Sequence, residues 1–368
     1  MLLLNTSRDA LLAPLQAVSG IVEKRHTLPI LSNVLIEKTG ERLTFTATDI
    51  EIQIRTTTAG NADGEDTAIT VGARKLQDIL RALPESEVSL TLDDKRLMVK
   101  AGRSRFQLQT LPAGDYPLLT LPEGEVARFT VAQKTFRHQL ARVAYAMAQQ
   151  DIRYYLNGLL LIAEGDTLIL VATDGHRLAY VESTLDTAVP GRFEAILPRK
   201  TTLELIRQVD DSDDPVEIIL AGNQAVFRFG AIELVTKLID GKFPDYQKVI
   251  PQNQPSCLAL PRAQLLSALQ RAAILSNEKL RGIRLVLDEG VLSIISSNTE
   301  QEEAQEEIEV DHHGETLNIG FNVGYLLDVL NNLSSETIEW RFSDGNSSAL
   351  VTVPGDNTFK YVVMPMRV

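Results

Sequence analysis

Cysteine and long apolar runs are scarce in this chain of 368 residues. Cys257 is the only cysteine, which excludes an intrachain disulfide bond and suits a reducing compartment. We expect its side chain to be half-buried and structural, because no partner motif for a nucleophile accompanies it. No apolar run approaches the ~18 residues that a membrane span needs, and the apolar start Met1–Leu4 is followed at once by polar residues. These absences favour a cytoplasmic protein without membrane contact.

The motifs of common enzymes and metal sites are also missing. The chain has no GxxxxGK[ST], no GxGxxG before a helix and no GxSxG. The acidic string Asp210–Pro215 lacks the alternating ligands and glycine of an EF-hand loop. The pair His312–His313 has no further metal-ligand spacing around it. We therefore expect no cofactor and no bound metal.

Positive charge is in short supply overall, yet it is concentrated where helices are predicted. The chain has 36 Lys and Arg against 49 Asp and Glu, for a net charge of −13. Six segments with helical spacing nevertheless carry +8 together, which leaves −21 on the rest of the chain. If these helices share one face, that face attracts phosphates and the opposite face repels them. The alternative is that Lys and Arg are simply good helix formers, although this does not explain why Asp and Glu are so few in the same segments. The segments are residues 7–20, 73–83, 133–150, 199–208, 262–279 and 322–332.

One sequence pattern occurs three times along the chain. Each copy opens with a short strand and a helix, in which a polar residue or proline precedes an apolar 3–4 spacing. The matching apolar residues are Leu11, Leu12 and Leu15, then Leu140, Val143 and Ala144, then Leu265, Leu266 and Leu269. Two strands around a turn follow, and then a second helix and further hairpins. The predicted first hairpins are SNVLIEKTGERLTFTATD, NGLLLIAEGDTLILVATD and RGIRLVLDEGVLSIISSNT.

The spacing of the copies predicts the domain organisation. Asp49 and Asp174 are 125 residues apart, as are Arg74 and Arg199, and Asn298 follows Asp174 after 124 residues. A period this long means that each copy is a whole domain. Helices that interrupt runs of antiparallel strands predict an α+β fold of three similar domains, each with two helices on antiparallel sheets and roughly eight strands. Proline-rich segments at residues 111–124 and 251–256 place the boundaries, which gives domains 1–125, 126–253 and 254–368.

Eight strings distributed along the chain carry a family resemblance. They are TLPILSN (27–33), QDIRYYLNG (150–158), VATDGHRLA (171–179), DGKFPDY (240–246), ILSNEKLRGIRL (274–285), NTEQEEAQEE (298–307), IGFNVGYLLDVLN (319–331) and YVVMPMRV (361–368). Together they resemble the bacterial sliding clamps, the beta subunits of DNA polymerase III, over essentially the whole chain. The resemblance implies a non-catalytic protein with the DNA clamp fold. Two subunits of three domains each would form a head-to-tail homodimeric ring, with helices lining the hole.

The resemblance further implies a processivity factor of DNA replication. Such a ring encircles double-stranded DNA without reading its sequence, so its contacts can stay weak and its grip is topological. Partners are the DNA polymerase III alpha subunit, other polymerases and repair proteins, all bound through a linear peptide motif. An ATP-dependent clamp loader is also implied, because a closed ring cannot thread circular DNA unaided and this chain has no nucleotide motif. The residues implied for DNA contact are Arg25, Arg74, Gln150, Tyr154, Tyr155, Arg199 and Lys200, with a core position as the alternative for the two tyrosines.

The ring is expected to close between the first domain of one chain and the third domain of the other. Ile274 and Leu275 form the apolar part of this interface by resemblance. Exposed ion pairs contribute only ~0–1 kcal/mol each, so we expect them to set the orientation while the apolar pair supplies much of the affinity. The alternative for the glutamates is a solvated strand edge. The charged residues are Lys75, Arg96, Arg103 and Arg105 on one side and Glu300, Glu302, Glu303 and Glu306 on the other.

The C-terminal string YVVMPMRV is unusually apolar for a chain end. Methionine adapts to ligands of different shape, so this tail suits a surface that accepts several partners, although a last core strand is an alternative. By resemblance it contributes to a two-part groove for peptides with a Gln and a terminal Leu–Phe pair. The Gln amide is expected to meet polar groups beside Met366, in the second part, and the apolar end to fill the pocket at Leu178, in the first. The first part comprises Leu156, Thr173, Gly175, His176, Arg177, Leu178, Pro244, Lys248, Val249, Val363 and Met364; the second comprises Asn322, Tyr325, Ser348, Pro365, Met366 and Arg367. Lys248 stands where the family usually has Arg.

Two other classes of function remain as alternatives. A hydrolase could use Asp174 and His176 as acid and base, and would need a substrate pocket and turnover. The matching positions Asp49 and Asn298 have no such histidine, which favours a strand-end turn with a structural aspartate. A monomeric scaffold would form no ring and need no loader. The threefold repeat and the separation of charge disfavour both.

Overall fold

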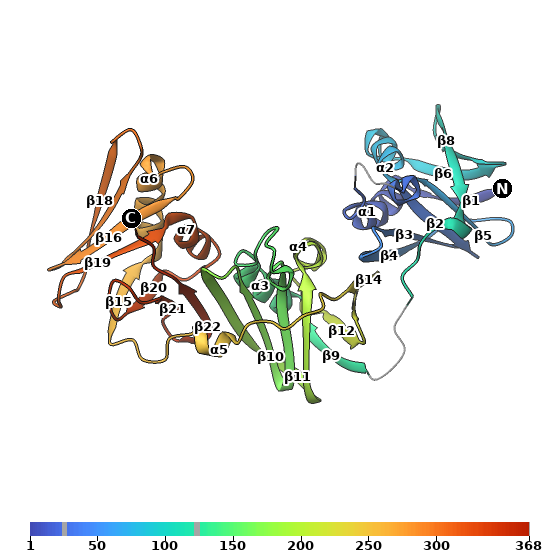
Figure 1. Cartoon of the computed structure of the whole chain (residues 1–368). Helices are drawn as coiled ribbons and strands as arrows, with labels where there is room; N and C mark the ends of the chain where they lie inside the picture. The colour runs from blue at the N-terminus through green and yellow to red at the C-terminus, as the bar shows by residue number, and fades with distance from the viewer. Residues whose placement is uncertain (24–27, 121–125, 368) are drawn as a thin grey trace. The chain divides into compact units, whose positions relative to one another are not determined.

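The computed structural model describes residues 1–23, 28–120 and 126–367 of the chain (Figure 1). The chain folds into two compact units: unit 1 contains residues 1–135 and 203–238, and unit 2 contains residues 136–202 and 239–368. The middle copy of the repeat is thus divided, because strand pairing joins its parts to both neighbouring copies. The domain boundaries expected at residues 125 and 253 do not follow this division and stay a prediction.

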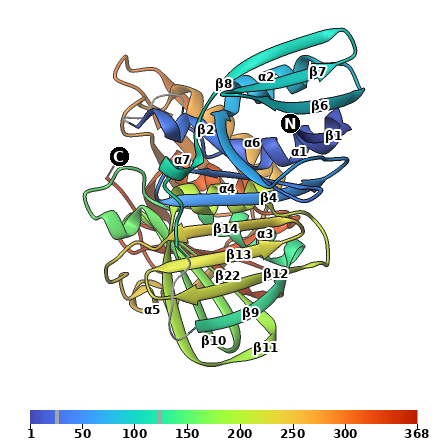
Figure 2. The same ribbon diagram turned by 90° about the vertical axis from the view of Figure 1, so that its right-hand side faces the viewer.

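Unit 1 is built on one antiparallel sheet of twelve strands in the order β1-β6-β7-β8-β5-β2-β3-β4-β14-β13-β12-β9. Strand β4 of the first copy pairs with β14 of the second, and Figure 2 shows this part of the sheet face-on. The strands are β1 (Leu2–Ser7), β2 (Asn33–Thr39), β3 (Arg42–Thr48), β4 (Ile52–Ala59), β5 (Thr67–Gly72), β6 (Glu87–Asp93), β7 (Arg96–Ala101), β8 (Ser104–Pro112), β9 (Val126–Ala132), β12 (Pro215–Ala221), β13 (Gln224–Phe229) and β14 (Ile232–Lys237).

Two helices of unit 1, α1 (Arg8–Ser19) and α2 (Ala73–Ala82), pack against each other, and α1 lies on strands β3 and β4. Ser7 caps α1, because its hydroxyl accepts a hydrogen bond from the backbone N–H of Ala10 at 3.3 Å. Leu11 and Leu15 are fully buried, as the apolar spacing predicts. Both predicted helices are therefore confirmed.

Unit 2 contains two further antiparallel sheets, ordered β10-β11-β22-β21-β20-β15 and β18-β17-β16-β19. Helices α6 and α7 pack together as α1 and α2 do, with α6 on β17 and β18. The strands are β10 (Gly158–Thr173), β11 (Arg177–Pro198), β15 (Ser256–Pro261), β16 (Gly282–Asp288), β17 (Val291–Ser297), β18 (Glu303–Glu309), β19 (Leu317–Asn322), β20 (Thr337–Phe342), β21 (Ala349–Val353) and β22 (Asp356–Val363). The helices are α5 (Tyr246–Val249), α6 (Arg262–Ala272) and α7 (Val323–Asn331).

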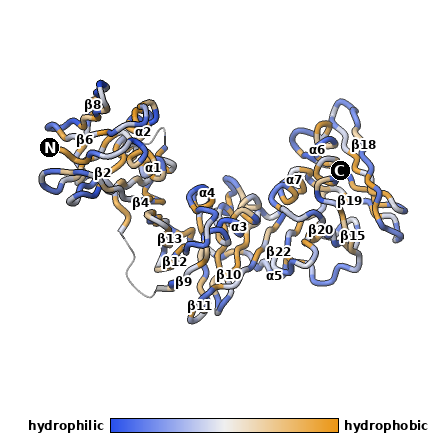
Figure 3. The backbone as a smooth tube through the Cα atoms, turned by 180° about the vertical axis from the view of Figure 1, so that it is seen from behind, coloured by the Kyte–Doolittle hydropathy of each residue, from blue (hydrophilic) through white to orange (hydrophobic). Residues whose placement is uncertain are grey.

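The predicted helices of the middle copy, α3 (Gln133–Ala144) and α4 (Arg199–Gln208), each run from one unit into the other. Short 3₁₀ turns complete the structure: η1 (Pro29–Ser32), η2 (Ala113–Asp115), η3 (Tyr154–Leu156) and η4 (Ala273–Leu275). Hydrophobic residues gather along the strands, whereas the loops between them are mostly hydrophilic (Figure 3). In the part of the chain that the structure describes, no helix is long and apolar enough to cross a membrane.

Two details differ from the expectation. The middle copy has six strands instead of about eight, because β10 and β11 are each one long strand where two shorter strands were expected. In β10, register shifts between Glu164 and Thr167 mark the place of the expected turn. Gly165 has a φ of +57°, and the two halves of β10 pair with opposite halves of β11. Cys257 is exposed rather than half-buried, because it alternates along β15 with the buried Leu258.

Candidate peptide groove and nucleic-acid contacts

A pocket of about 180 Å³ lies in unit 2, where β10 and β11 end beside the C-terminal tail. Nine of the residues predicted for the first part of the groove line it: Leu156, Thr173, Gly175, His176, Arg177, Leu178, Pro244, Val249 and Met364. Arg153, Tyr155 and Val362 complete the lining, and sequence analysis did not assign them to it. The floor continues into a buried cluster that includes Leu178, Tyr180 and Val362.

The turn between β10 and β11 positions the polar edge of this pocket. The hydroxyl of Thr173 donates to the carbonyl of Arg177 at 2.6 Å and accepts from the N–H of Gly175 at 3.1 Å. One carboxylate oxygen of Asp174 accepts from the backbone N–H groups of His176 at 2.9 Å and Arg177 at 3.1 Å. Asp174 is therefore structural, as predicted from the repeat.

The guanidinium of Arg153 lies over the same turn. A Cβ atom on Gly175, whose φ is +90°, would lie 2.9 Å from the guanidinium nitrogens of Arg153. Arg153 donates to both oxygens of Asp151 at 3.0 and 2.8 Å and to the carbonyl of Asp174 at 3.1 Å. Hydrogen bonds from Arg153 lower the pKa of Asp151 to about 2. A side chain at position 175 would be strained at this positive φ and would displace the guanidinium of Arg153.

Main-chain hydrogen bonds hold the C-terminal tail at two residues, Met364 and Met366. The N–H of Met364 donates to the carbonyl of His176, and the N–H of Met366 donates to that of Gly320, both at 2.9 Å. Within β22, Val363 is fully buried and pairs with Arg177, whereas Val362 lines the pocket. The structure thus replaces Val363 by its neighbour in the wall, because successive side chains of a strand point to opposite faces.

Arg177 lies at the centre of a buried polar cluster, with 9% of its side chain exposed. Its guanidinium donates to Asp174 at 3.0 Å, to Asp328 at 2.5 Å and to the carbonyl of Tyr145 at 2.7 Å. It also lies 4.4 Å from the ring centroid of Tyr325. Burial by itself lowers the pKa of Arg177, but its acidic neighbours raise it overall, so this side chain stays charged.

Two residues of the second part of the predicted groove, Asn322 and Tyr325, lie at the start of α7. The side chain of Asn322 caps α7 by accepting from the N–H of Gly324 at 2.8 Å. Tyr325 is stacked with His176, with ring centroids 6.5 Å apart. The backbone carbonyl of Ser348 accepts from the side-chain amide of Gln254 at 2.8 Å. Pro365 and Met366 are half-buried, and Arg367 is exposed. Lys248 does not line the pocket, and its ammonium lies 2.9 Å from Asp245.

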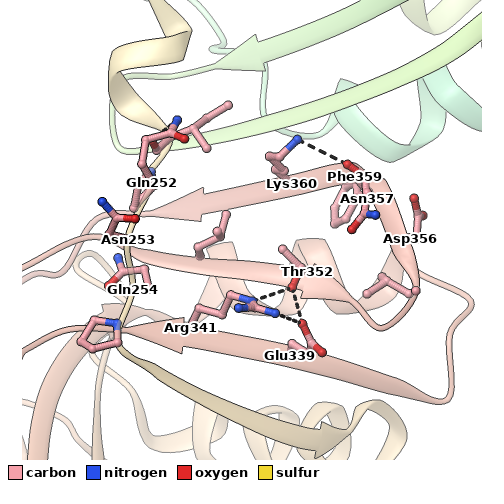
Figure 4. Close-up of a pocket in the computed structure, with 16 residues that line it drawn as sticks. Gln252, Asn253, Gln254, Glu339, Arg341, Thr352, Asp356, Asn357, Phe359 and Lys360 are labelled. Atoms are coloured by element: carbon pink, nitrogen blue, oxygen red, sulfur yellow. Dashed lines mark hydrogen bonds and ion pairs between the residues drawn. The ribbon is translucent and has the colours of Figure 1, made fainter.

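Two larger cavities of unit 2 are polar. One of about 650 Å³ lies between the segment Ile250–Pro255 and the sheet face of β20, β21 and β22, where Arg341, Glu339 and Thr352 bond to one another (Figure 4). The other, of about 590 Å³, adjoins the pocket and shares His176 and Arg177 with it. None of the predicted groove residues lines the first cavity.

The residues predicted to touch DNA lie on helices and on one loop. Arg74 on α2 is exposed and donates to the carbonyl of Val22 at 2.9 Å. Arg199, at the start of α4, is half-buried and donates to the carbonyl of Met147 at 3.3 Å; Lys200 beside it is also half-buried. Arg25 lies outside the described residues.

The loop after α3 holds the remaining predicted contacts. Gln150 is exposed with a φ of +58°, and Tyr154 is exposed as well. Tyr155 is half-buried, packs against the buried cluster beneath the pocket and lines that pocket, while its contact with DNA stays a prediction. Ile152 between them is 97% exposed. This loop was not predicted from composition or periodicity, and the string QDIRYYLNG was its only signal.

Of the residues predicted for ring closure, Arg105 lies on β8 and Glu303 and Glu306 lie on β18, whereas the others lie on α2, on β7, in η4 and in turns or loops. In β8, residues 104–109 pair with β7 on one side, and in β18 all residues pair with β17 on one side. Ile274 is 77% exposed, Leu275 is half-buried, and Leu280 is exposed nearby in sequence. Glu306 is bound by Arg271 at 2.8 and 2.6 Å, which lowers its pKa. Lys75, Arg96, Arg103, Arg105, Glu300, Glu302 and Glu303 are exposed.

Comparisons with known proteins place the chain in one family. Models of the DNA polymerase III beta subunit match it with their N-terminal domain at residues 2–120, their central domain at 130–245 and their C-terminal domain at 247–367. The beta sliding clamp of Pseudomonas aeruginosa is 48% identical over 367 residues, covering 98% of each chain. That of Escherichia coli K12 is 44% identical over 361 residues, again covering 98% of each.

Solved structures agree with the sequence relatives. The crystal structure of the DNA polymerase III subunit beta from Pseudomonas aeruginosa matches with a TM-score of 0.94 at 46% identity, covering 99% of each chain. The pol III beta structure from Caulobacter crescentus matches with a TM-score of 0.92 at 39% identity, covering 99% of this chain and 100% of that one. The fold, the three domain models and the identity along the whole length together show that this chain belongs to the DNA polymerase III beta subunit family, the bacterial DNA sliding clamps.

Proposed function

We propose that this sliding clamp closes with a second copy of itself into a ring around double-stranded DNA. In this state it tethers the DNA polymerase III alpha subunit, other polymerases and repair proteins, and an ATP-dependent clamp loader places it on DNA. The observation that carries the tethering role is the pocket at the start of β11, whose rim is completed by the fixed tail residue Met364. Such a concave apolar pocket with a few polar groups at its edge suits short linear peptides.

The groove proposal is tested by removing the tail. Deleting Met364–Val368 removes one wall of the pocket, and buried anchors of this kind contribute ~2 kcal/mol or more per residue. Calorimetry with a synthetic peptide that carries Gln and a terminal Leu–Phe pair should show no binding, while sizing still shows the dimer. Leu118→Ser changes an exposed leucine of unit 1 and serves as the matched control. Continued binding by the truncated protein would place the groove elsewhere.

Ring closure is supported by complementary edges. One side of β8 is free over residues 104–109 and carries exposed Arg105, with exposed Arg103 in the turn just before this strand, and the free side of β18 carries exposed Glu303. Two such edges can pair as adjacent strands, which also hides edges that otherwise promote aggregation. Since Glu306 is already bound by Arg271, we propose that the other glutamates supply most of the attraction.

Ring closure is tested through its apolar part. Replacing Ile274 and Leu275 by serine should give monomers in light scattering, because exposed ion pairs alone contribute little. Ile152→Ser removes an even more exposed isoleucine outside the proposed interface and should leave the dimer intact. A persistent dimer in the double variant would contradict the interface.

Encirclement of DNA is tested by topology. After loading, the protein should stay on nicked circular DNA and leave once that DNA is linearised, whereas an ordinary DNA-binding protein is indifferent to the ends. Combining Arg25→Ala with Gln150→Ala should lower loading onto primed DNA, with a salt dependence typical of phosphate contacts. Unchanged loading of this variant would remove both residues from the DNA surface.

We also propose that the chain is not an enzyme and acts in the bacterial cytoplasm. The hydrolase alternative requires a free carboxylate at position 174, but this group accepts two backbone hydrogen bonds and binds Arg177. Groups of three or more His, Cys, Asp or Glu that could hold a metal are absent from the described residues. Turnover of any ester or phosphodiester by the purified protein, lost on Asp174→Asn, would favour the hydrolase.

A further inference from the structure

Asp328 of α7 lies outside both parts of the predicted groove, yet it binds a residue of the groove wall. We propose that Asp328 is a positioning residue for partner peptides, which fixes the second part of the groove relative to the first by holding Arg177 against Tyr325. The inference rests on the proposed groove and adds a residue that the groove itself does not contain.

The position of Asp328 on its helix supports this role. Asp328 follows Tyr325 by three residues on α7, so the two side chains share one face of the helix. Asp328 accepts from the guanidinium of Arg177 at 2.5 Å, while the ring of Tyr325 lies 4.4 Å from the same guanidinium. One arginine of β11 is therefore held from two sides by one helix of the third copy.

The neighbouring contacts transmit this arrangement to the groove. His176, next to Arg177 in the turn, is stacked on Tyr325. The hydroxyl of Tyr361 on β22 donates to the carbonyl of Tyr325 at 2.8 Å. Any shift of α7 therefore changes the place of Tyr325 in the second part of the groove relative to His176 and Arg177 in the first.

Asp328 is suited to positioning rather than to folding. Its side chain is 45% exposed and lines the polar cavity next to the groove, so its loss buries no unpaired charge of its own. Arg177 would keep Asp174 and the carbonyl of Tyr145 as partners, which leaves its buried charge compensated. What is lost is the ion pair between Arg177 of β11 and Asp328 of α7.

The test is a coupling measurement between protein and peptide. The probes are a synthetic pentapeptide with Gln first and Leu–Phe last, and the same peptide with Gln replaced by Ala. We expect Asp328→Asn to weaken binding of the Gln peptide about tenfold in calorimetry, because the neutral amide oxygen can still accept from Arg177 but holds the guanidinium far less strongly than the carboxylate does. Replacing Gln by Ala in the peptide lowers its affinity for the parent protein. In Asp328→Asn protein this decrease in affinity should be less than about twofold, because the second part of the groove is displaced.

Three controls separate positioning from general effects. Asp311→Asn removes the same charge at an exposed site and should bind like the parent protein. Asp328→Glu keeps the carboxylate and should recover most of the affinity. The thermal midpoint of Asp328→Asn should stay within a few degrees of the parent's.

Each outcome decides between the ideas. If Asp328→Asn binds the Gln peptide like the parent, or keeps the full loss on Gln-to-Ala, the positioning role is overturned while the groove stands. If the parent protein binds neither peptide, the proposed groove fails, and the role of Asp328 fails with it.

Discussion

The turns after β3 and after β10 are two versions of one structure in the first and second copies of the repeat. In the first, the Thr48 hydroxyl donates to the carbonyl of Ile52 at 2.9 Å, and Asp49 accepts from the N–H groups of Glu51 and Ile52 at 2.9 and 2.8 Å. The Thr173 and Asp174 turn has the same hydrogen bonds at matching positions. The backbone of the turn is therefore common to both.

The turns of the first and second copies differ in their side chains at two positions. The left-handed position holds Ile50 in the first copy, with a φ of 72°, and Gly175 in the second. The last position holds Ile52, which is buried in the core of unit 1, where the second copy has Arg177 and its polar cluster. The turn backbone that both copies share thus becomes a candidate binding site in the second copy. One glycine there leaves room for Arg153, and one arginine reaches α7.

The largest expected effect on stability comes from removing the whole carboxylate of Asp174 in the second turn. Asp174→Ala loses two backbone hydrogen bonds and one partner of buried Arg177, so we expect a destabilisation of about 3 kcal/mol. Asp174→Asn should cost only about 1 kcal/mol, because the amide oxygen can still accept both N–H groups. Asn298 in the third copy shows this, since it accepts from Glu300 and Glu302 at 3.0 Å each. Urea unfolding measures the difference, and equal losses for both variants would show that the stabilisation comes from the charge, which both variants remove, and not from the two backbone hydrogen bonds.

Exchanging the left-handed residues between the copies has the next largest effect. Gly175→Ile adds a β-branched side chain at a positive φ and displaces Arg153, so peptide affinity should fall about a hundredfold. The reverse change, Ile50→Gly, lies in unit 1 and should leave peptide binding unchanged. Calorimetry decides, and full binding by Gly175→Ile would mean that the cover by Arg153 is not needed.

The smallest effect concerns the ion pair that covers the second turn. The pKa of Asp151 is about 2 when Arg153 binds it, below the ordinary value of 3.8. Because the folded-state pKa is the lower one, the stabilisation by this pair is present above about pH 4 and is lost as the pH falls towards 2. Arg153→Ala should raise the pKa of Asp151, followed by NMR, towards 3.8, because the side-chain hydrogen bonds are lost while the backbone N–H of residue 153 still donates. A midpoint that stays near 2 would assign the shift to the backbone instead.

Much of the fold could be predicted because its signals are local. The apolar spacing at Leu11 and Leu15 and the repeated Asp turn depend on neighbours within a few residues. Val363 was placed in the groove wall instead of Val362, because strand register decides the face and a shift of one residue reverses it. Arg153 was missed, since its place over Gly175 depends on contacts between segments more than twenty residues apart. The division of the middle copy likewise results from pairing between distant strands.

The exposed position of Cys257 on β15 has a practical consequence for spectroscopy. A fluorophore with a thiol-reactive group will attach at this one site of the unmodified chain, because the sequence offers no second cysteine. Partial desolvation raises the pKa of the Cys257 thiol, so labelling should proceed faster at mildly alkaline pH, where more thiolate is present. A ring of two copies would carry one donor and one acceptor dye after mixed labelling. Energy transfer between them would then report the opening and closing of single rings in real time.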